Sequence, residues 1–115
     1  MSPKFKRVMS WILSAIVTLV FLFAGLAKLA GVEQQVEAFA AWGYPDWSIY
    51  AVGVIEVILA LLIIFPRTRV TGTNLVYIWA VVAIFTHIQA EPPQYIQIIP
   101  DIVIIALAFF IRRLS

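Results

Sequence analysis

Four ionisable side chains lie within or at the edge of four long apolar stretches, one in each stretch: Lys28, Glu56, His87 and Asp101. A charged group near the middle of a membrane costs about 2.5–3.5 kcal/mol on the insertion scale, so such groups usually have a partner or a function. Amine, imidazole and carboxyl groups can hydrogen-bond a polar ligand and exchange protons with it. These four residues are therefore the candidate site for ligand binding or proton exchange.

Other residue types that carry chemistry are scarce. The chain has one histidine and no cysteine, which excludes disulfides, Cys-based metal sites and a bis-histidine haem site supplied by this chain alone. We expect no metal site and no built-in cofactor.

Spacings of three and four residues place each candidate on a helix face that is rich in small side chains. The faces are Ser14, Thr18, Phe21, Gly25 and Lys28; Gly53, Glu56 and Ala60; Ala80, Ala83, His87 and Ala90; and Asp101 with Ala108. Small residues let membrane helices approach closely, so these faces should turn towards neighbouring helices. We expect the four polar groups to converge in one pocket in the outer half of the membrane.

Each candidate also has a purely structural explanation. Taken alone, Lys28 is better explained as a side chain that extends to the outer headgroups, and Asp101 as an acid that complements a helix dipole. His87 fits a hydrogen-bonded packing residue equally well. Glu56 lies near the middle of its stretch, so function or a buried partner is the better explanation there. A buried Lys28–Glu56 pair could also serve only to fix how two helices pack.

The apolar stretches predict the fold. Of the 115 residues, 63% are hydrophobic and 12% are charged, and a soluble domain of this size cannot bury so much apolar surface. Inside a bilayer each span must pair its own backbone polar groups, so the spans should be helices. We predict an all-α integral membrane four-helix bundle, one domain over residues 1–115, with spans near residues 10–29, 47–65, 73–89 and 95–112.

The basic residues predict the orientation in the membrane. Seven of the eight lie before the first stretch, between the second and third, or after the fourth: Lys4, Lys6, Arg7, Arg67, Arg69, Arg112 and Arg113. In the other two connections, between the first and second stretches and between the third and fourth, the only charged residues are acidic. Because basic segments are retained in the cytoplasm, both termini of this multi-pass cell-membrane protein should be cytoplasmic. The same positions explain the net charge of +2 without a nucleic-acid partner.

The segment between the first two spans has a pattern of its own. Val32, Val36 and Phe39 recur at helical spacing, and Gly43 and Pro45 end the repeat. We predict a short amphipathic helix on the outer surface. A loop whose aromatic residues lie at the headgroup level explains the pattern equally well. These aromatic residues are Trp42, Tyr44, Trp47 and Tyr50.

The fourth span is the least regular. A helix from Pro100 to Ile111 is only about 18 Å long, too short to cross a bilayer core of about 30 Å. Either residues 95–99 are helical as well, with a kink at Pro100, or they enter the membrane in another conformation buried against protein. We expect the kink.

Several motifs resemble the DoxX-like family of small four-helix membrane proteins. They are Gly25-Leu26-Ala27-Lys28-Leu29, Gly43-Tyr44-Pro45-x-Trp47, Gly53-x-x-Glu56 and Ala83-x-x-x-His87. The resemblance covers nearly the whole chain after residue 10, and it implies that Lys28, Glu56 and His87 are the family's polar motif positions. It also implies association with membrane redox systems such as thiosulfate:quinone oxidoreductase, or a role in assembly. Val57-Ile58-Leu59 replaces the glycines that many relatives have after the glutamate.

Three functions fit these residues. The first is an accessory subunit of a membrane oxidoreductase or assembly system, whose outward-facing polar pocket holds a quinone-like ligand. The second is a small proton-coupled transporter that acts as a homo-oligomer, and the third is a structural assembly factor without a small ligand. Besides the lipid bilayer, the partners are therefore a membrane oxidoreductase or a second copy of the chain. We do not expect catalysis by this chain alone.

Overall fold

The structure is a computed structural model that describes residues 2–90 and 93–114. In this part of the chain every regular element is a helix, which confirms the predicted all-α class. The elements are α1 (Pro3–Leu29), α2 (Glu33–Ala41), α3 (Ser48–Ile64), α4 (Arg69–Gln89), a 3-10 turn η1 (Tyr95–Gln97) and α5 (Ile98–Leu114).

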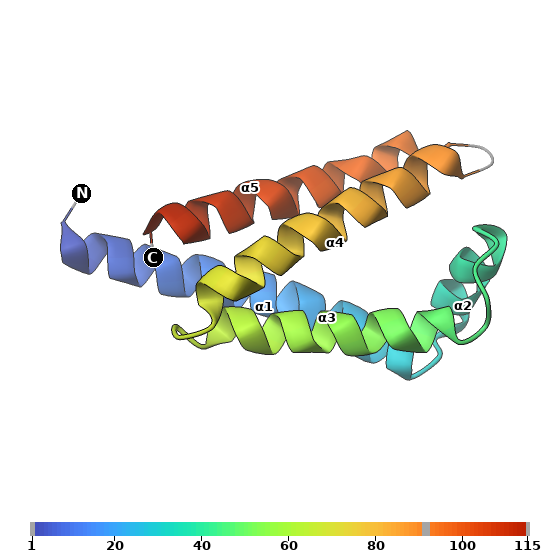
Figure 1. Cartoon of the computed structure of the whole chain (residues 1–115), viewed down its shortest axis with the longest axis horizontal. Coiled ribbons are helices and arrows are strands. Elements are labelled where there is room, and N and C mark those ends of the chain that lie inside the picture. Colours follow the sequence, from blue (N-terminus) through green and yellow to red (C-terminus); the bar gives the residue numbers. More distant parts are fainter. Residues whose placement is uncertain (1, 91–92, 115) are drawn as a thin grey trace.

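The long helices form two antiparallel pairs, α1 with α3 and α4 with α5 (Figure 1). The pairs meet where α1 begins and α5 ends, which we call the terminal end, and they diverge towards the opposite end, which we call the α2 end. The hydrophobic core fills the region where the pairs meet. Its fully buried side chains include Val17, Ile63, Val76, Ala108 and Ile111. Divergence at the α2 end leaves space that this core does not fill.

The surface of the bundle matches a bilayer. Three helical segments, α1, α4 and η1 with α5, are long and apolar enough to cross a membrane. The remaining long helix, α3, has 17 residues, or about 26 Å of helix, and is largely apolar apart from Ser48 and the buried Glu56. Large apolar side chains face outward on all sides, for example Phe23, Val81 and Ile78, which are 71%, 65% and 62% exposed. The chain is therefore a multi-pass membrane protein.

Two glycines set the position of α2. Gly31 and Gly43 have positive φ values of 68° and 83°, a conformation that a side chain disfavours. The Val32 N–H donates to the Ala27 carbonyl, and the Tyr44 N–H donates to the Phe39 carbonyl. These bonds define a Schellman motif at the end of α1 and another at the end of α2. The chain therefore leaves both helices in fixed directions.

The predicted short helix between the first two spans exists as α2. Phe39 is buried against the bundle, whereas Val32 and Val36 are exposed. Gln35 and Ala38 are half-buried instead. The Schellman turn at Gly31 rotates the helix so that these residues, rather than the valines, face the bundle.

The predicted kink at Pro100 is wrong. The α-helix begins at Ile98, so Pro100 lies in the first turn of α5, where its missing N–H leaves no helical hydrogen bond unmade. Residues Tyr95–Gln97 form the 3-10 turn η1 just before it. Together η1 and α5 provide 20 residues, enough to cross a membrane without a kink.

The close packing of α1 on α3 depends on Gly25 and Gly53. A Cβ atom added to Gly25 would lie 2.8 Å from the Gly53 carbonyl oxygen, and one added to Gly53 would lie 3.0 Å from the Gly25 carbonyl oxygen. The backbones therefore touch at this point, as small residues permit in membrane helix pairs. This contact brings the end of α1 against the middle of α3.

Candidate functional site

Lys28 and Glu56 form an ion pair across the α1–α3 contact. The Lys28 Nζ atom lies 2.8 Å from Glu56 Oε1, and the two side chains are 11% and 1% exposed. Side chains lean towards the N-terminus of their helix. Because α1 and α3 are antiparallel, Lys28 leans towards the terminal end and Glu56 leans towards the α2 end, so the two meet. Lys28 does not extend away from the bundle, contrary to the explanation favoured for it alone.

Trp79 on α4 completes the surroundings of the carboxylate. Its indole Nε1–H donates a hydrogen bond of 3.1 Å to Glu56 Oε2. The same indole packs edge-on against Phe21 of α1, with ring centroids 4.8 Å apart. Both oxygens of Glu56 thus have a protein partner, and the contact links the two helix pairs.

His87 and Asp101 form the second polar pair. His87 Nδ1 lies 2.8 Å from Asp101 Oδ2. His87 lies in the last turn of α4 and Asp101 in the first turn of α5, positions where a helix dipole favours a positive and a negative charge respectively. When Asp101 is ionised it only accepts hydrogen bonds, and His87 then donates through Nδ1. Within residues 2–90 and 93–114, its Nε2 atom has no hydrogen-bond partner.

All four predicted site residues line one cavity of about 850 Å³ at the α2 end. The α1–α3 pair contributes Lys28 and Glu56 to one wall, and the α4–α5 pair contributes His87 and Asp101 to the other. The cavity lies where the helix pairs diverge. The structure therefore brings the four residues together as two polar pairs on facing walls, one of them the Lys28–Glu56 ion pair.

The lining residues show where the cavity opens. Ile55 and Ile58 of α3 and Ile78 and Val82 of α4 line it and are also about half exposed or more. These side chains belong to the apolar surface of the bundle. The cavity therefore reaches that surface between α3 and α4, where lipid chains are the expected neighbours.

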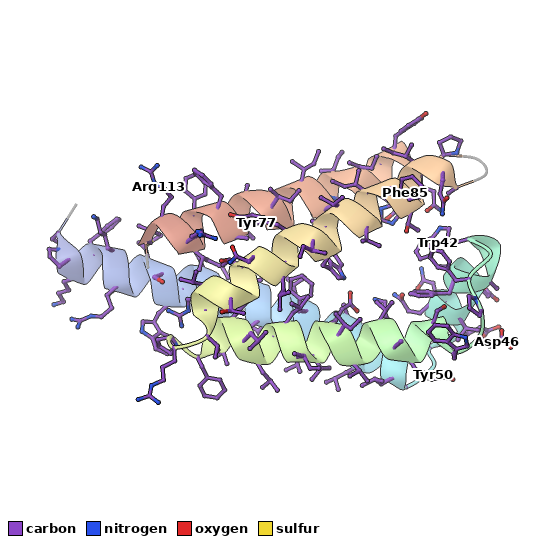
Figure 2. All side chains as sticks on the ribbon, viewed as in Figure 1. Trp42, Asp46, Tyr50, Tyr77, Phe85 and Arg113 are labelled. Atoms are coloured by element: carbon purple, nitrogen blue, oxygen red, sulfur yellow. The ribbon has the colours of Figure 1, made fainter. Side chains whose placement is uncertain are left out.

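Residues from α2 and the segment after it cover the cavity at the α2 end. Trp42 lies on the side of this segment that faces α4, while Asp46 and Tyr50 lie on the other side (Figure 2). The Trp42 indole donates to Gln94 Oε1 at 3.0 Å and packs edge-on against the His87 ring, with centroids 5.6 Å apart. These contacts join α2 and the segment after it, which we call the cover, to the α4–α5 pair.

A second tie joins the same two parts of the molecule. The Tyr44 hydroxyl lies 2.5 Å from Thr86 Oγ1. Tyr44 follows α2, and Thr86 is buried on α4 next to His87. The cover is thus held at two points on the opposite helix pair.

The profile of the DoxX-like family matches residues 12–111. The chain belongs to the DoxX-like family. No curated protein and no solved structure matches the chain. The predicted family resemblance is therefore confirmed over almost the whole length of the bundle.

In this DoxX-like chain, sequence reasoning missed the aromatic residues of the site. Trp42 was counted among the residues that anchor at the membrane surface, and Trp79 was not singled out. Trp79 lies one residue before Ala80, on the edge of the face that carries His87, so its position offered a signal. Its hydrogen bond to Glu56 depends on how α4 crosses α3, which no spacing reveals.

The described residues of the DoxX-like chain contain no group of three or more side chains placed to hold a metal ion. The Lys28–Glu56 pair joins an ammonium to a carboxylate, and the His87–Asp101 pair joins an imidazole to a carboxyl group. Their arrangement suits hydrogen bonding and proton exchange with a ligand that carries polar oxygen atoms.

Proposed function

We propose that this DoxX-like protein is an accessory subunit of a membrane redox system and that its cavity holds the ring of a quinone-like ligand. The proposal rests chiefly on one observation: a large cavity has the Lys28–Glu56 and His87–Asp101 pairs on facing walls and an opening lined by apolar side chains. An amphipathic ligand with a polar ring and an apolar tail fits this combination. The redox role itself is inferred from the family resemblance.

The size of the cavity supports a ligand of this kind. Small-molecule sites usually enclose roughly 300–1,000 Å³, and this cavity has about 850 Å³. The ring would lie between Glu56 and His87, and the tail would pass between Ile58 and Val82 towards the lipid. A lipid-soluble ligand could then enter from the bilayer without crossing water.

Two groups are available to hold ring oxygens. The Lys28 ammonium has three N–H donors, of which Glu56 takes one. The His87 ring has Nε2 in addition to the nitrogen bound to Asp101. Lys28 can donate a hydrogen bond to a carbonyl oxygen of the ligand, and His87 can do so through Nε2 when its ring is protonated.

His87 is the better candidate for proton exchange. Asp101 holds its Nδ1–H and fixes the orientation of the ring, so that Nε2 can take or give a proton. Both oxygens of Glu56 already have partners in Lys28 and Trp79. We therefore assign Glu56 the role of positioning Lys28. Electrons for any redox change of the ligand come from the partner oxidoreductase.

We further propose that α1, α3, α4 and η1 with α5 all span the membrane, with the terminal end in the cytoplasm. Seven basic residues lie at that end, as the positive-inside rule requires. The cavity then faces the outer half of the bilayer.

The experiment is purification in nanodiscs made from membranes that contain quinone, followed by mass spectrometry of extracted lipids. We expect quinone in the wild-type protein near one molecule per chain, and a loss of about tenfold in His87→Asn, since one charged hydrogen bond is worth about that factor. Glu37→Gln, on the exposed side of α2, is the control and should retain quinone. Absence of quinone from the wild type, or equal retention by His87→Asn, would contradict the proposal.

One observation favours a second function, that of a structural assembly factor. Lys28, Glu56 and Trp79 satisfy one another, as expected of a device that fixes helix packing. In that case an apolar pair at positions 28 and 56 would preserve assembly, and no small ligand would co-purify.

A further inference from the structure

A second pocket of about 470 Å³ lies at the terminal end, far along the bundle from the cavity. The start of α1 contributes Lys6, Arg7 and Trp11 to it, and the start of α4 contributes Arg69. The other lining residues are Pro3, Ser10, Pro66 and Leu114. Among the described residues that line it, every charged side chain is cationic.

Arg69 is held rigidly in the wall of this pocket. It is only 4% exposed. Its Nε–H donates to the Ile63 carbonyl at 2.8 Å, and its Nη2–H donates to the Ile64 carbonyl at 2.9 Å, so that it caps the end of α3. The guanidinium also lies 4.6 Å from the centre of the Trp11 ring.

The charge of Arg69 has no counter-ion in the described part of the chain. Its acceptors are two carbonyls and the hydroxyl of Ser10, all of them neutral. A buried charge is costly unless an opposite charge accompanies it. One N–H on each terminal nitrogen of the guanidinium has no acceptor among the described residues.

The charges around the pocket reinforce this imbalance. Seven basic residues belong to the terminal end, whereas every acidic residue of the described chain lies near α2 or in the cavity. Lys6 and Arg7 are exposed and flank Arg69 in the same pocket. The summed field at this end therefore attracts anions.

We propose that this pocket binds a phosphate group, either the headgroup phosphate of an anionic phospholipid or free phosphate. The planar guanidinium of Arg69 matches the geometry of phosphate oxygens, and Lys6 and Arg7 add charge from the exposed side. Trp11, Pro66 and Leu114 supply apolar walls, which favour a phosphate attached to acyl chains. The site is independent of the proposed quinone cavity.

The test compares two charge-matched double variants of the full chain in nanodiscs that contain equal amounts of phosphatidylglycerol and phosphatidylcholine. Lys6→Gln with Arg7→Gln removes two pocket charges. Lys4→Gln with Arg113→Gln removes two basic charges that do not line the pocket. All four side chains are exposed, so neither variant should unfold. Native mass spectrometry then counts the lipids that stay bound after detergent extraction.

We expect the wild type to retain phosphatidylglycerol in preference to phosphatidylcholine. The pocket variant should lose this retention by about thirtyfold, since each of the two basic residues removed contributes about 1 kcal/mol to binding an anionic lipid. The control variant should keep it within about twofold. Equal losses in both variants, or equal retention of the two lipids together with no binding of phosphate, would overturn the proposal.

A second arm identifies the source of the phosphate group. Inorganic phosphate at millimolar concentration is added to the wild type in detergent without phospholipid, and binding is measured by isothermal titration. Binding that is lost in the pocket variant supports free phosphate as a ligand. Selective lipid retention without binding of inorganic phosphate supports the phospholipid.

Discussion

The Lys28 ammonium on α1 and the Glu56 carboxylate on α3 meet at 2.8 Å close to the Gly25–Gly53 backbone contact. The ion pair and the glycine contact therefore depend on the same helix crossing. The effect of the ion pair on stability follows from its burial. Removal of one partner leaves the other charged and nearly inaccessible to water, whereas removal of both leaves an apolar contact.

This relationship predicts strong non-additivity. Lys28→Met alone or Glu56→Leu alone should lower the free energy of unfolding by about 3–5 kcal/mol, and the double variant should recover most of that loss. Unfolding by denaturant in detergent micelles measures all three. Losses that simply add would show that the two charges do not interact.

Trp79 should contribute through its hydrogen bond to Glu56. Trp79→Phe keeps an aromatic ring beside Phe21 but removes the indole N–H, and should cost about 1.5–3 kcal/mol because the acceptor is charged. The cost should fall sharply when the same change is made in the Glu56→Leu background. A cost that is equal in both backgrounds would assign the effect to packing instead.

The backbone contact between α1 and α3 should not tolerate a methyl group. Gly25→Ala would place Cβ 2.8 Å from the Gly53 carbonyl oxygen, and since backbone must then move, we expect a loss of about 1–3 kcal/mol. Ala106→Val, on an exposed face of α5, adds volume without such a contact and serves as the control. Thermal unfolding in detergent compares the two variants. Equal stability of Gly25→Ala and wild type would argue against the observed crossing.

The absence of cysteine from the sequence permits a test of the cavity. Ala83→Cys lies in the cavity wall, whereas Ala80→Cys lies one turn deeper on the same face, fully buried and outside the cavity lining. A small water-soluble thiol reagent applied to the folded protein should modify the first at least tenfold faster than the second, because an opening free energy of about 1.4 kcal/mol already gives that ratio. Equal rates would mean that water does not reach the cavity.

The same chemistry tests the orientation in the membrane. Ser2→Cys is at the terminal end and Asp46→Cys is at the α2 end, and both positions are exposed. An impermeant maleimide added to intact cells should label Asp46→Cys only. Labelling of Ser2→Cys should require permeabilised cells. The reverse pattern would place the cavity in the cytoplasmic half.

Much of the fold was predictable because it depends on local properties of the chain. Apolar length predicted the helices, since a bilayer leaves the backbone no other partner. Apolar length did not predict where α1 begins. The Ser2 hydroxyl accepts a hydrogen bond from the Phe5 N–H, and the helix begins at Pro3, earlier than the apolar stretch indicated. The predicted kink at Pro100 was wrong, because the α-helix begins only at Ile98 and places Pro100 in its first turn. The face that α2 turns towards the bundle was not predicted, because the turn at Gly31 decides it.

The sequence by itself determined that Lys28, Glu56, His87 and Asp101 would be costly to place in lipid and that three- and four-residue spacing would turn them inward. Only the tertiary structure decided that they pair as Lys28 with Glu56 and His87 with Asp101, on facing walls of one cavity. It also decided that Trp79 joins the first pair and that Arg69 is buried beside α3. The physical reason is that periodicity fixes which way a side chain points from its own helix, whereas a contact depends on where two helices cross and how far they diverge.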